Sequence, residues 1–294
     1  MPSDARTSAT PKDSPFSRSD RPLITYVYAE SDNARENLKF FLAKGLHGAA
    51  DFVFVFNGET NASRLVPQLP HVRTVTRPNT CFDMGAIGEV LQEGDLWRNY
   101  KRFITMNASV RGPFLPMWSS ACWSEVFLAM VTDTTKLAGM TVNCLPRPHV
   151  QSMVLATDDV GMATLLNASL ATSASPADFF GAENEPVGFS ACYNYWASAV
   201  HAEIGASALI VNAGFKLDAL LTLLHAEAGV DEYCRANPGL DDVLHDKSYF
   251  GANVHPYETV FVKANRDIDP SLMRSMTSWH LRMNTSSFDT CGSQ

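Results

Sequence analysis

The sequence lacks two features that define broad classes of protein. It contains no stretch of about 20 apolar residues, the length that an α-helix needs to cross a bilayer, so we expect no membrane span in this chain. Positive charge is also scarce, because 23 Lys and Arg residues are outnumbered by 31 Asp and Glu residues, for a net charge of −8. The basic residues do not cluster, and an acidic surface repels the nucleic-acid backbone. Nucleic acid is therefore not expected as a partner.

The motifs of several common enzyme classes are also missing. The six cysteines include no C-x-x-C pair, so we predict neither a zinc site nor a dense disulfide framework. The first expected strand is followed by Ala29-Glu-Ser-Asp32, where a dinucleotide-dependent oxidoreductase would carry G-x-G-x-x-G. Neither a P-loop nor a G-x-S-x-G elbow occurs, which argues against the common nucleotidases and α/β-hydrolases.

The N-terminal segment differs in composition from the rest of the chain. Residues 1–21 are rich in Ser, Asp, Arg, Thr and Pro and bury too little to offset their ordering entropy, so we expect disorder there and one domain over residues 22–294. The segment has no apolar signal-peptide core. As written, the chain is expected in the cytoplasm, or in the Golgi lumen if an N-terminal anchor is missing. Four sequons leave secretion open, at Asn61, Asn107, Asn167 and Asn284.

The first half of the sequence alternates between strand and helix patterns. Runs rich in β-branched and aromatic residues predict strands, and intervening amphipathic segments predict helices. The expected strands are 23–29, 51–56, 72–76 and 102–106, and the expected helices are 33–46 and 83–92. This rhythm is typical of a Rossmann-like α/β fold, an open and mostly parallel sheet with helices on both faces. The second half is less regular, with strands expected at 136–142 and 152–157 and a helix at 193–204.

Polar clusters fall where the expected strands end. Asn57-Gly58, Arg77-Pro-Asn79 and Asn107-Ala-Ser109 follow the second, third and fourth strands. In open α/β sheets, ligands bind outside the carboxyl ends of the strands. The pattern therefore predicts a nucleotide crevice formed by these three clusters, without naming its chemistry.

Several short motifs resemble those of one family. The segments 77–79 and 82–86, the run Met106-Asn-Ala-Ser-Val-Arg-Gly-Pro-Phe114 and the run Pro148-His-Val-Gln-Ser-Met-Val154 are similar to motifs of the rhamnan synthesis protein F family of glycosyltransferases. Related uncharacterised eukaryotic sequences also share a helix like 199–203 and the C-terminal run 255–263. The resemblance covers about residues 23–280. It implies a GT-A-like fold, a nucleotide-sugar donor and a role in polysaccharide biosynthesis.

This chain departs from the family pattern at the motif that usually holds a metal ion. GT-A enzymes commonly carry Asp-x-Asp at the end of this strand, whereas this chain has Asn107-Ala108-Ser109. Hard cations prefer charged oxygen ligands, so we expect Mn²⁺ or Mg²⁺ to be bound weakly if at all, and we assign no metal ligand. Fixed cations are an alternative means of neutralising the diphosphate, and Arg111, Lys263 and Arg266 are the candidates. Arg111 and Arg266 are equally compatible with solvated surface charges.

Other candidates for donor binding lie in the loops after the strands. Asn57 and Arg77 either hold the base or ribose or complete turns. Asp83 and Gly85 open the second expected helix, where Asp83 either caps the helix or, as the resemblance implies, faces the nucleotide. The full donor-binding set comprises Asn57, Arg77, Asp83, Gly85, Asn107, Ser109, Arg111 and Lys263.

An inverting transfer needs a base for the acceptor hydroxyl. Glu203 is the first candidate, because it lies beside an apolar helix face that raises the proton affinity of an acid, and Asp159 at the end of a strand is the second. His149 and Gln151 point to one face of a strand, and His255 lies in the C-terminal motif, so these three are candidates for acceptor contacts. A satisfied core histidine is the alternative for His149.

The sequence thus predicts a glycosyltransferase that moves a sugar from a nucleotide-sugar to a carbohydrate or other hydroxyl acceptor. Trp118, Trp123 and Tyr195 are candidates for stacking on a sugar, with burial in the core as the alternative. Since Asp-x-Asp is missing, a catalytically silent nucleotide- or carbohydrate-binding module of the same fold is the other hypothesis.

Overall fold

The first strands are apolar on both faces, as strands covered by helices on both sides must be. β1 (Leu23–Ala29) and β2 (Asp51–Asn57) bury nearly all their side chains, whereas β3 (Val72–Arg77) exposes polar side chains at the sheet edge. In the computed structural model, which describes residues 18–173, 175–240 and 242–292, β1 pairs in parallel with β2 and β2 with β3.

Seven strands form the central sheet, in the order β10-β6-β9-β4-β1-β2-β3. β4 spans Arg102–Asn107, β6 Thr135–Gly139, β9 Val154–Asp158 and β10 Lys216–Ala219. Every neighbouring pair is parallel except those of β9, which runs antiparallel to both β4 and β6. The predicted α/β fold with an open, mostly parallel sheet is therefore confirmed.

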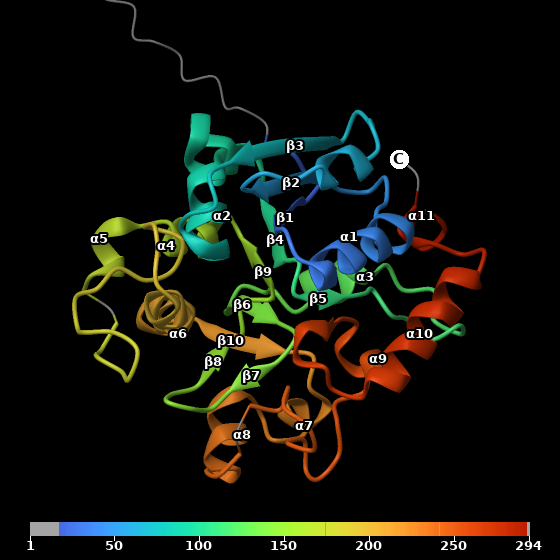
Figure 1. The fold of residues 1–294 in the computed structure, drawn as a ribbon. Coiled ribbons are helices and arrows are strands. Elements are labelled where there is room, and N and C mark those ends of the chain that lie inside the picture. Colours follow the sequence, from blue (N-terminus) through green and yellow to red (C-terminus); the bar gives the residue numbers. More distant parts are fainter. Residues whose placement is uncertain (1–17, 174, 241, 293–294) are drawn as a thin grey trace, which may run out of the picture.

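Helices cover both faces of this sheet (Figure 1). α1 (Asp32–Lys44) and α3 (Trp123–Leu128) lie on one face, where the rings of Phe41 and Trp123 pack with centroids 5.7 Å apart. α2 (Phe82–Gln92), α4 (Asp159–Leu165) and α6 (Trp196–Asn212) lie on the other and contact one another. α6 begins three residues later than the helix expected from the sequence and continues through Asn212.

Shorter elements complete the chain. Two small antiparallel ribbons join β5 to β11 and β7 to β8. Their bounds are β5 Val110–Arg111, β7 Val142–Asn143, β8 His149–Val150 and β11 Val262–Lys263. The remaining α-helices are α5 Ala168–Ala171, α7 Thr222–Ala226, α8 Val230–Ala236, α9 Pro256–Thr259, α10 Pro270–Arg282 and α11 Ser287–Thr290. Three 3₁₀ helices span Ala62–Leu65, Glu93–Asn99 and Ala264–Arg266.

The main hydrophobic core cluster of the described residues extends from Leu23 to Phe261, and two small clusters lie beside it, around Phe114 and around Val187. The sequence predicts disorder over residues 1–21, of which residues 1–17 lie outside the described part of the chain. The last residues of this segment are described, and there Arg21 donates to Asp51 Oδ1 at 3.0 Å and to the Ala50 carbonyl at 2.8 Å. None of the helices in the described part of the chain is long and apolar enough to cross a membrane.

Three disulfides also hold the fold together, contrary to the expectation from the sequence. They pair Cys81 with Cys192, Cys122 with Cys291 and Cys144 with Cys234, so every cysteine of the chain is oxidised. The partners are 90 to 169 residues apart in sequence, and spacing along the chain carries no signal for such pairs. The prediction against a disulfide framework was therefore wrong.

Candidate functional site

A cleft of about 1130 Å³ opens at the carboxyl ends of the parallel strands. The chain proceeds from β1 outward to β3 and then returns to place β4 on the other side of β1, so the strand order reverses between β1 and β4. Open α/β sheets bind ligands at such a switch point. The lining includes Asn57, Asn79, Asn107 and Ser109, so all three polar clusters singled out in the sequence contribute to one cleft.

The end of β4 carries a closed hydrogen-bond network. Asn107 Nδ2 donates to Asp83 Oδ2, and Asn107 Oδ1 accepts from the backbone N–H of Ser109 at 3.1 Å and from its hydroxyl. Burial raises the pKa of the Asp83 carboxyl, the Asn107 hydrogen bond opposes that rise, and the charge of Glu203 adds to it. The Asp83 charge and the Asn107 amide thus hold each other in place at the cleft wall.

Glu203 lies on the cleft face of α6, on the turn that faces β8. Its Oε2 accepts from the backbone N–H of Ser152 at 2.6 Å and from the Ser152 hydroxyl. His149 Nδ1 lies 2.8 Å from the Arg147 carbonyl and so carries the proton, while Nε2 lies 3.8 Å from Glu203 Oε1. One carboxylate oxygen of Glu203 is therefore fixed and the other is available to the cleft.

Gln151 lines the cleft but both ends of its amide are engaged. Its Oε1 accepts from the Thr141 hydroxyl at 2.6 Å, and its Nε2 donates to Asp242 Oδ2 at 3.0 Å. The expected shared strand face is only partly present, because β8 ends at Val150 and Gln151 follows it. Gln151 therefore positions Asp242, whereas His149 faces Glu203.

Two cations reach the cleft from the C-terminal segment. β11 pairs with β5 in the register Lys263–Val110, and the Ala264 N–H donates to the Ser109 carbonyl at 2.9 Å, which brings the segment to the end of β4. Burial lowers the pKa of Lys263, although the charge of Glu203 partly restores it. Its ammonium forms no hydrogen bond or ion pair with the residues that the structure describes. Arg266 pairs with Asp242 at 2.6 Å.

Two of the predicted donor-binding residues, Arg77 and Gly85, lie behind the cleft wall. Arg77 is buried and donates to Asn57 Oδ1 at 3.0 Å and to the Thr80 carbonyl at 2.9 Å, so it holds the loop after β3. Gly85 allows α2 to approach another segment closely, since a Cβ there would lie 2.7 Å from the Ala191 carbonyl oxygen. These positions support the lining without belonging to it.

Arg111 fits neither of the roles considered for it. It is only 6% exposed, so it is not a surface charge, and it is not part of the cleft lining. Its guanidinium donates to Asn37 Oδ1 and to Glu36 Oε2, both at 2.8 Å. Both partners lie on α1, so Arg111 joins that helix to β5.

Asp159 lies at the other end of the strands from the cleft. Because β9 runs antiparallel, its last residue, Asp158, pairs with Arg102 at the beginning of β4, and the cleft is at the other end of β4. Asp159 forms an ion pair with Arg18, and Asp158 one with Lys136. The sequence interpretation assumed a parallel strand, and the reversal of β9 removes Asp159 from the cleft.

His255 also lies outside the main cleft. It caps α9, where its Nδ1 accepts from the Tyr257 N–H at 3.2 Å, and it lines a separate cavity of about 210 Å³ that shares Lys263 with the cleft. The nearby Glu258 Oε1 accepts hydrogen bonds from the Thr222 N–H and the Tyr249 hydroxyl, each at 3.0 Å. Both residues therefore stabilise the C-terminal segment that carries Lys263.

The Cys81–Cys192 disulfide is part of the cleft wall. Cys81 lines the cleft and precedes α2, and the Cys81 N–H donates to Asn194 Oδ1 at 3.3 Å. The bond ties the loop before Asp83 to the segment that leads into α6. Two cleft walls that are far apart in sequence are thus linked covalently.

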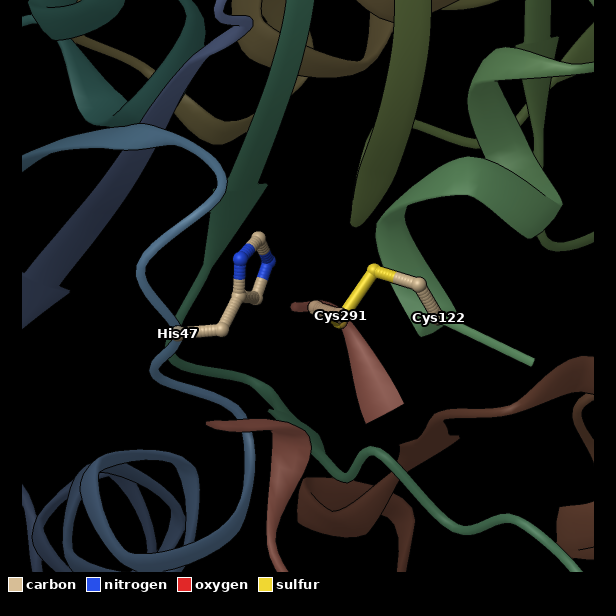
Figure 2. Close-up of side chains that lie close together, drawn as sticks. All are labelled: His47, Cys122 and Cys291. Carbon is tan, nitrogen blue, oxygen red and sulfur yellow. A yellow bond between two sulfur atoms is a disulfide. The ribbon is translucent and has the colours of Figure 1, made fainter. Parts of the chain in front are cut away.

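A second cysteine pair lies beside a buried histidine, away from the cleft. Figure 2 shows the His47 ring next to the Cys122–Cys291 disulfide, and the three ligand atoms lie within 4.8 Å of one another. The two sulfurs are bonded to each other and are not thiolates, the form that binds zinc. Burial lowers the pKa of His47 to about 4. This cluster is a packed crosslink.

The aromatic side chains at the cleft differ from those expected. Trp123 is buried, with its Nε1 donating to the Gly45 carbonyl at 2.8 Å, and Trp118 and Tyr195 lie outside the lining. Phe179, Phe180 and Trp196 line the cleft instead. A signal for Trp196 exists in the sequence, because it precedes Glu203 by two helical turns and so shares its face.

Comparison with known proteins adds no further constraint. No protein-family model matches the chain, and no curated protein matches its sequence. The interpretation of the cleft therefore depends on its own chemistry.

Proposed function

We propose that this protein is a glycosyltransferase that binds a nucleotide-sugar in the switch-point cleft and transfers the sugar to a carbohydrate hydroxyl. One observation carries the proposal, namely that a carboxylate with an available oxygen, Glu203, and the cations Lys263 and Arg266 line the same cleft. Sugar transfer needs both groups, a base for the acceptor and positive charge for the leaving diphosphate. The mostly parallel sheet supports the GT-A-like fold that the motif resemblance implies.

In this proposal the nucleotide lies along the ends of β1, β2 and β4, against Asn57, Asp83 and Asn107. Its diphosphate extends toward Lys263 and Arg266 in the C-terminal segment. The Lys263 ammonium suits this role, since burial makes its charge costly until an anion pairs with it. Arg266 is already held in place by Asp242 and offers its remaining donors.

The residues at the end of β4 fit a divalent cation poorly. Asn107 Oδ1 accepts two hydrogen bonds from Ser109, and one oxygen of Asp83 accepts from Asn107. A hard cation needs several free oxygen ligands, charged ones above all. In this proposal the fixed cations Lys263 and Arg266, and not Mn²⁺ or Mg²⁺, neutralise the diphosphate.

The transfer is a single displacement in which Glu203 is the base. The acceptor oxygen forms a bond to the anomeric carbon of the donor, and the bond from that carbon to the phosphate oxygen breaks. The acceptor proton moves to Glu203 Oε1, while Oε2 stays bound to Ser152. The electron pair leaves with the nucleoside diphosphate, which Lys263 and Arg266 stabilise. Such a displacement inverts the anomeric configuration.

The first test combines donor binding and turnover. UDP-, GDP-, dTDP- and CMP-sugars are screened by thermal shift, with manganese and with EDTA, and one nucleotide class should raise the midpoint in both conditions. With that donor and a mixture of oligosaccharides, Glu203→Gln should lower release of the nucleotide at least about 100-fold and leave donor binding intact. The matched control is Glu93→Gln, at an exposed position outside the lining.

The outcomes separate the two functions that the cleft permits. Unchanged turnover in Glu203→Gln removes Glu203 from the mechanism. Donor binding without turnover in the wild-type chain favours a catalytically silent module, for which the closed network around Asn107 is the supporting observation. A chain that binds no nucleotide-sugar contradicts the transferase proposal.

We also propose that the protein works in an oxidising compartment, such as the Golgi lumen. Three disulfides that pair all six cysteines support this, because disulfides are rare in proteins of the reducing cytosol. Of the two locations that the sequence leaves open, the lumen is the one in which these bonds persist.

A further inference from the structure

Three aromatic side chains form a continuous patch at the mouth of the cleft. The rings of Phe179 and Phe180 are 5.3 Å apart, those of Phe180 and Trp196 are 5.5 Å apart, and all three residues line the cleft. Phe179 is 90% exposed and Trp196 65% exposed. Exposed apolar groups beside a polar cleft mark binding surfaces. We call these three residues the aromatic rim.

The backbone beneath the rim is fixed by a buried hydrogen-bonded pair, Asp178 and His201. The Asp178 carboxylate accepts from the N–H groups of Phe180 at 2.8 Å and Gly181 at 3.0 Å, and it lies 2.8 Å from His201 Nδ1 on α6. The side chains of Asp178 and His201 are 0% and 1% exposed. A turn anchored in this way holds Phe179 and Phe180 outward.

A second anchor holds the other end of the same loop. Arg147 donates through Nη2 to the carbonyls of Ala177 at 2.8 Å and Pro176 at 3.3 Å. The exposed Phe179 and the half-buried Phe180 lie on a loop held by both anchors and are pre-organised for contact, which lowers the ordering cost of binding.

The rim continues inward along one face of α6. Trp196, Ala199, Val200 and Glu203 all line the cleft, and their spacing of three, four and seven residues places them on one stripe of the helix. Seven residues of α-helix rise about 10 Å, a length that a short oligosaccharide spans. A ligand that stacks on Trp196 therefore reaches Glu203 with its far end.

We propose that the aromatic rim is the acceptor subsite and that the acceptor is a neutral glycan, with one pyranose ring stacked on Trp196 and Phe179. This inference rests on the transferase function proposed above and names its acceptor. A pyranose carries C–H groups on its faces and hydroxyls around its edge, so aromatic rings cover the faces while the polar cleft binds the edge.

The charges near the rim favour a neutral sugar over an acidic one. The exposed carboxylates Glu183 and Glu185 follow the loop in sequence, and Glu203 lies at the inner end of the stripe. The guanidinium of Arg147, which anchors the loop, donates through Nη2 to two backbone carbonyls. A uronic acid or a sulfated sugar would meet these carboxylates, whereas the cleft cations Lys263 and Arg266 are assigned to the donor diphosphate.

Binding of the full-length chain to an array of defined oligosaccharides, neutral and uronate-containing, tests the proposal without any donor. The wild-type chain should bind neutral oligosaccharides, and Trp196→Ala and Phe179→Ala should each weaken binding, Trp196→Ala by about tenfold or more. Trp196→Phe keeps a ring and should recover part of the loss. The matched control is Trp118→Ala, which removes a tryptophan that is 80% exposed and lies outside the cleft lining.

Each outcome decides for or against the rim. Equal binding by wild type and Trp196→Ala, preference for uronate-containing glycans, or absence of any binding by the wild type overturns the proposal. An equal loss in Trp118→Ala overturns it too, because the effect is then not specific to the cleft. Glycan binding by a chain that binds no nucleotide-sugar leaves the subsite standing and refutes only the transferase.

Discussion

Asp83 occupies a position where its charge is costly. Burial and the charge of Glu203 raise the pKa of its carboxyl, and the Asn107 amide only partly offsets them. At neutral pH the ionised carboxylate therefore destabilises the fold relative to an uncharged side chain. Residues that reduce stability yet line a cleft are frequent at functional sites. We infer that Asp83 contacts a hydroxyl-bearing part of the donor.

Replacing Asp83 by asparagine should separate stability from binding. Asp83→Asn removes the buried charge and keeps an oxygen for the Asn107 amide, so we expect a higher midpoint of thermal unfolding at pH 7 and weaker donor binding. For a carboxyl whose pKa is raised by folding, the native state binds more protons, and stability falls as pH rises from the ordinary pKa of 3.8 through the raised value.

The pH dependence provides the control for this experiment. The advantage of Asp83→Asn should shrink as pH falls toward 3.8 and disappear below it, where the wild-type carboxyl is protonated in both states. Thermal unfolding of both proteins across this range measures it. A difference that is constant with pH would show that Asp83 acts through packing and not through its charge.

For single side chains, the sequence predicted the place of a residue on its strand or helix better than the partners that the side chain contacts. Asn57, Asn107 and Glu203 do line the cleft, because their places at strand ends or on a helix face follow from periodicity. Arg77 and Arg111 do not, because a sequence cannot distinguish a cation that reaches a ligand from one that is buried against its own chain. Their hydrogen bonds depend on tertiary packing.

For the strands, the bounds could be predicted from the sequence but the direction of one strand could not. The runs that form β1, β2, β3 and β4 are each long, apolar or β-branched, and were placed within a residue of their observed ends. The direction of β9 was not predictable, since an all-buried strand has the same composition in either orientation. The whole of the error at Asp159 follows from that one reversal.

The loop between α1 and β2 should make the fold sensitive to acid. Burial, with smaller effects from His71 and Arg21, lowers the pKa of His47 from 6.5 to about 4. Below pH 6.5 the His47 imidazole is protonated in the unfolded chain but stays neutral in the folded chain. The free energy of unfolding should therefore fall by about 3 kcal/mol between pH 6.5 and 4. Urea unfolding at several pH values measures this loss.

The variant His47→Gln removes the titrating ring from this loop. It should flatten the dependence of unfolding free energy on pH over the same range, whatever it does to stability at pH 7. If the slope is unchanged, the acid sensitivity arises elsewhere, with His71 and His280 as the next candidates, because burial lowers the pKa of each.

At the scale of the whole molecule, two of the three disulfides differ in role: Cys81–Cys192 shapes the cleft, whereas Cys122–Cys291 only closes the fold. Cys122→Ala with Cys291→Ala opens a bond between positions 169 residues apart and should cost about 2 to 5 kcal/mol of unfolding free energy while donor affinity stays unchanged. Cys81→Ala with Cys192→Ala should lower stability and also weaken donor binding, because Cys81 is part of the cleft wall.

Urea unfolding and donor titration on both double variants measure the two effects. The first double variant is the control for the second, since each removes one long-range crosslink. Equal donor affinity in both would contradict a role for the Cys81–Cys192 bond in the cleft.

The crosslink between Cys81 and Cys192 also restricts how a ligand enters and leaves. It ties the loop that carries Asp83 to the segment that leads into Trp196, so these two walls cannot separate to release a product. The wall formed by residues 242–266 carries Lys263 and Arg266 and contains no cysteine. For the nucleotide donor proposed above, we therefore expect opening on that side, so that the segment proposed to hold the phosphates sets the lifetime of the bound nucleotide.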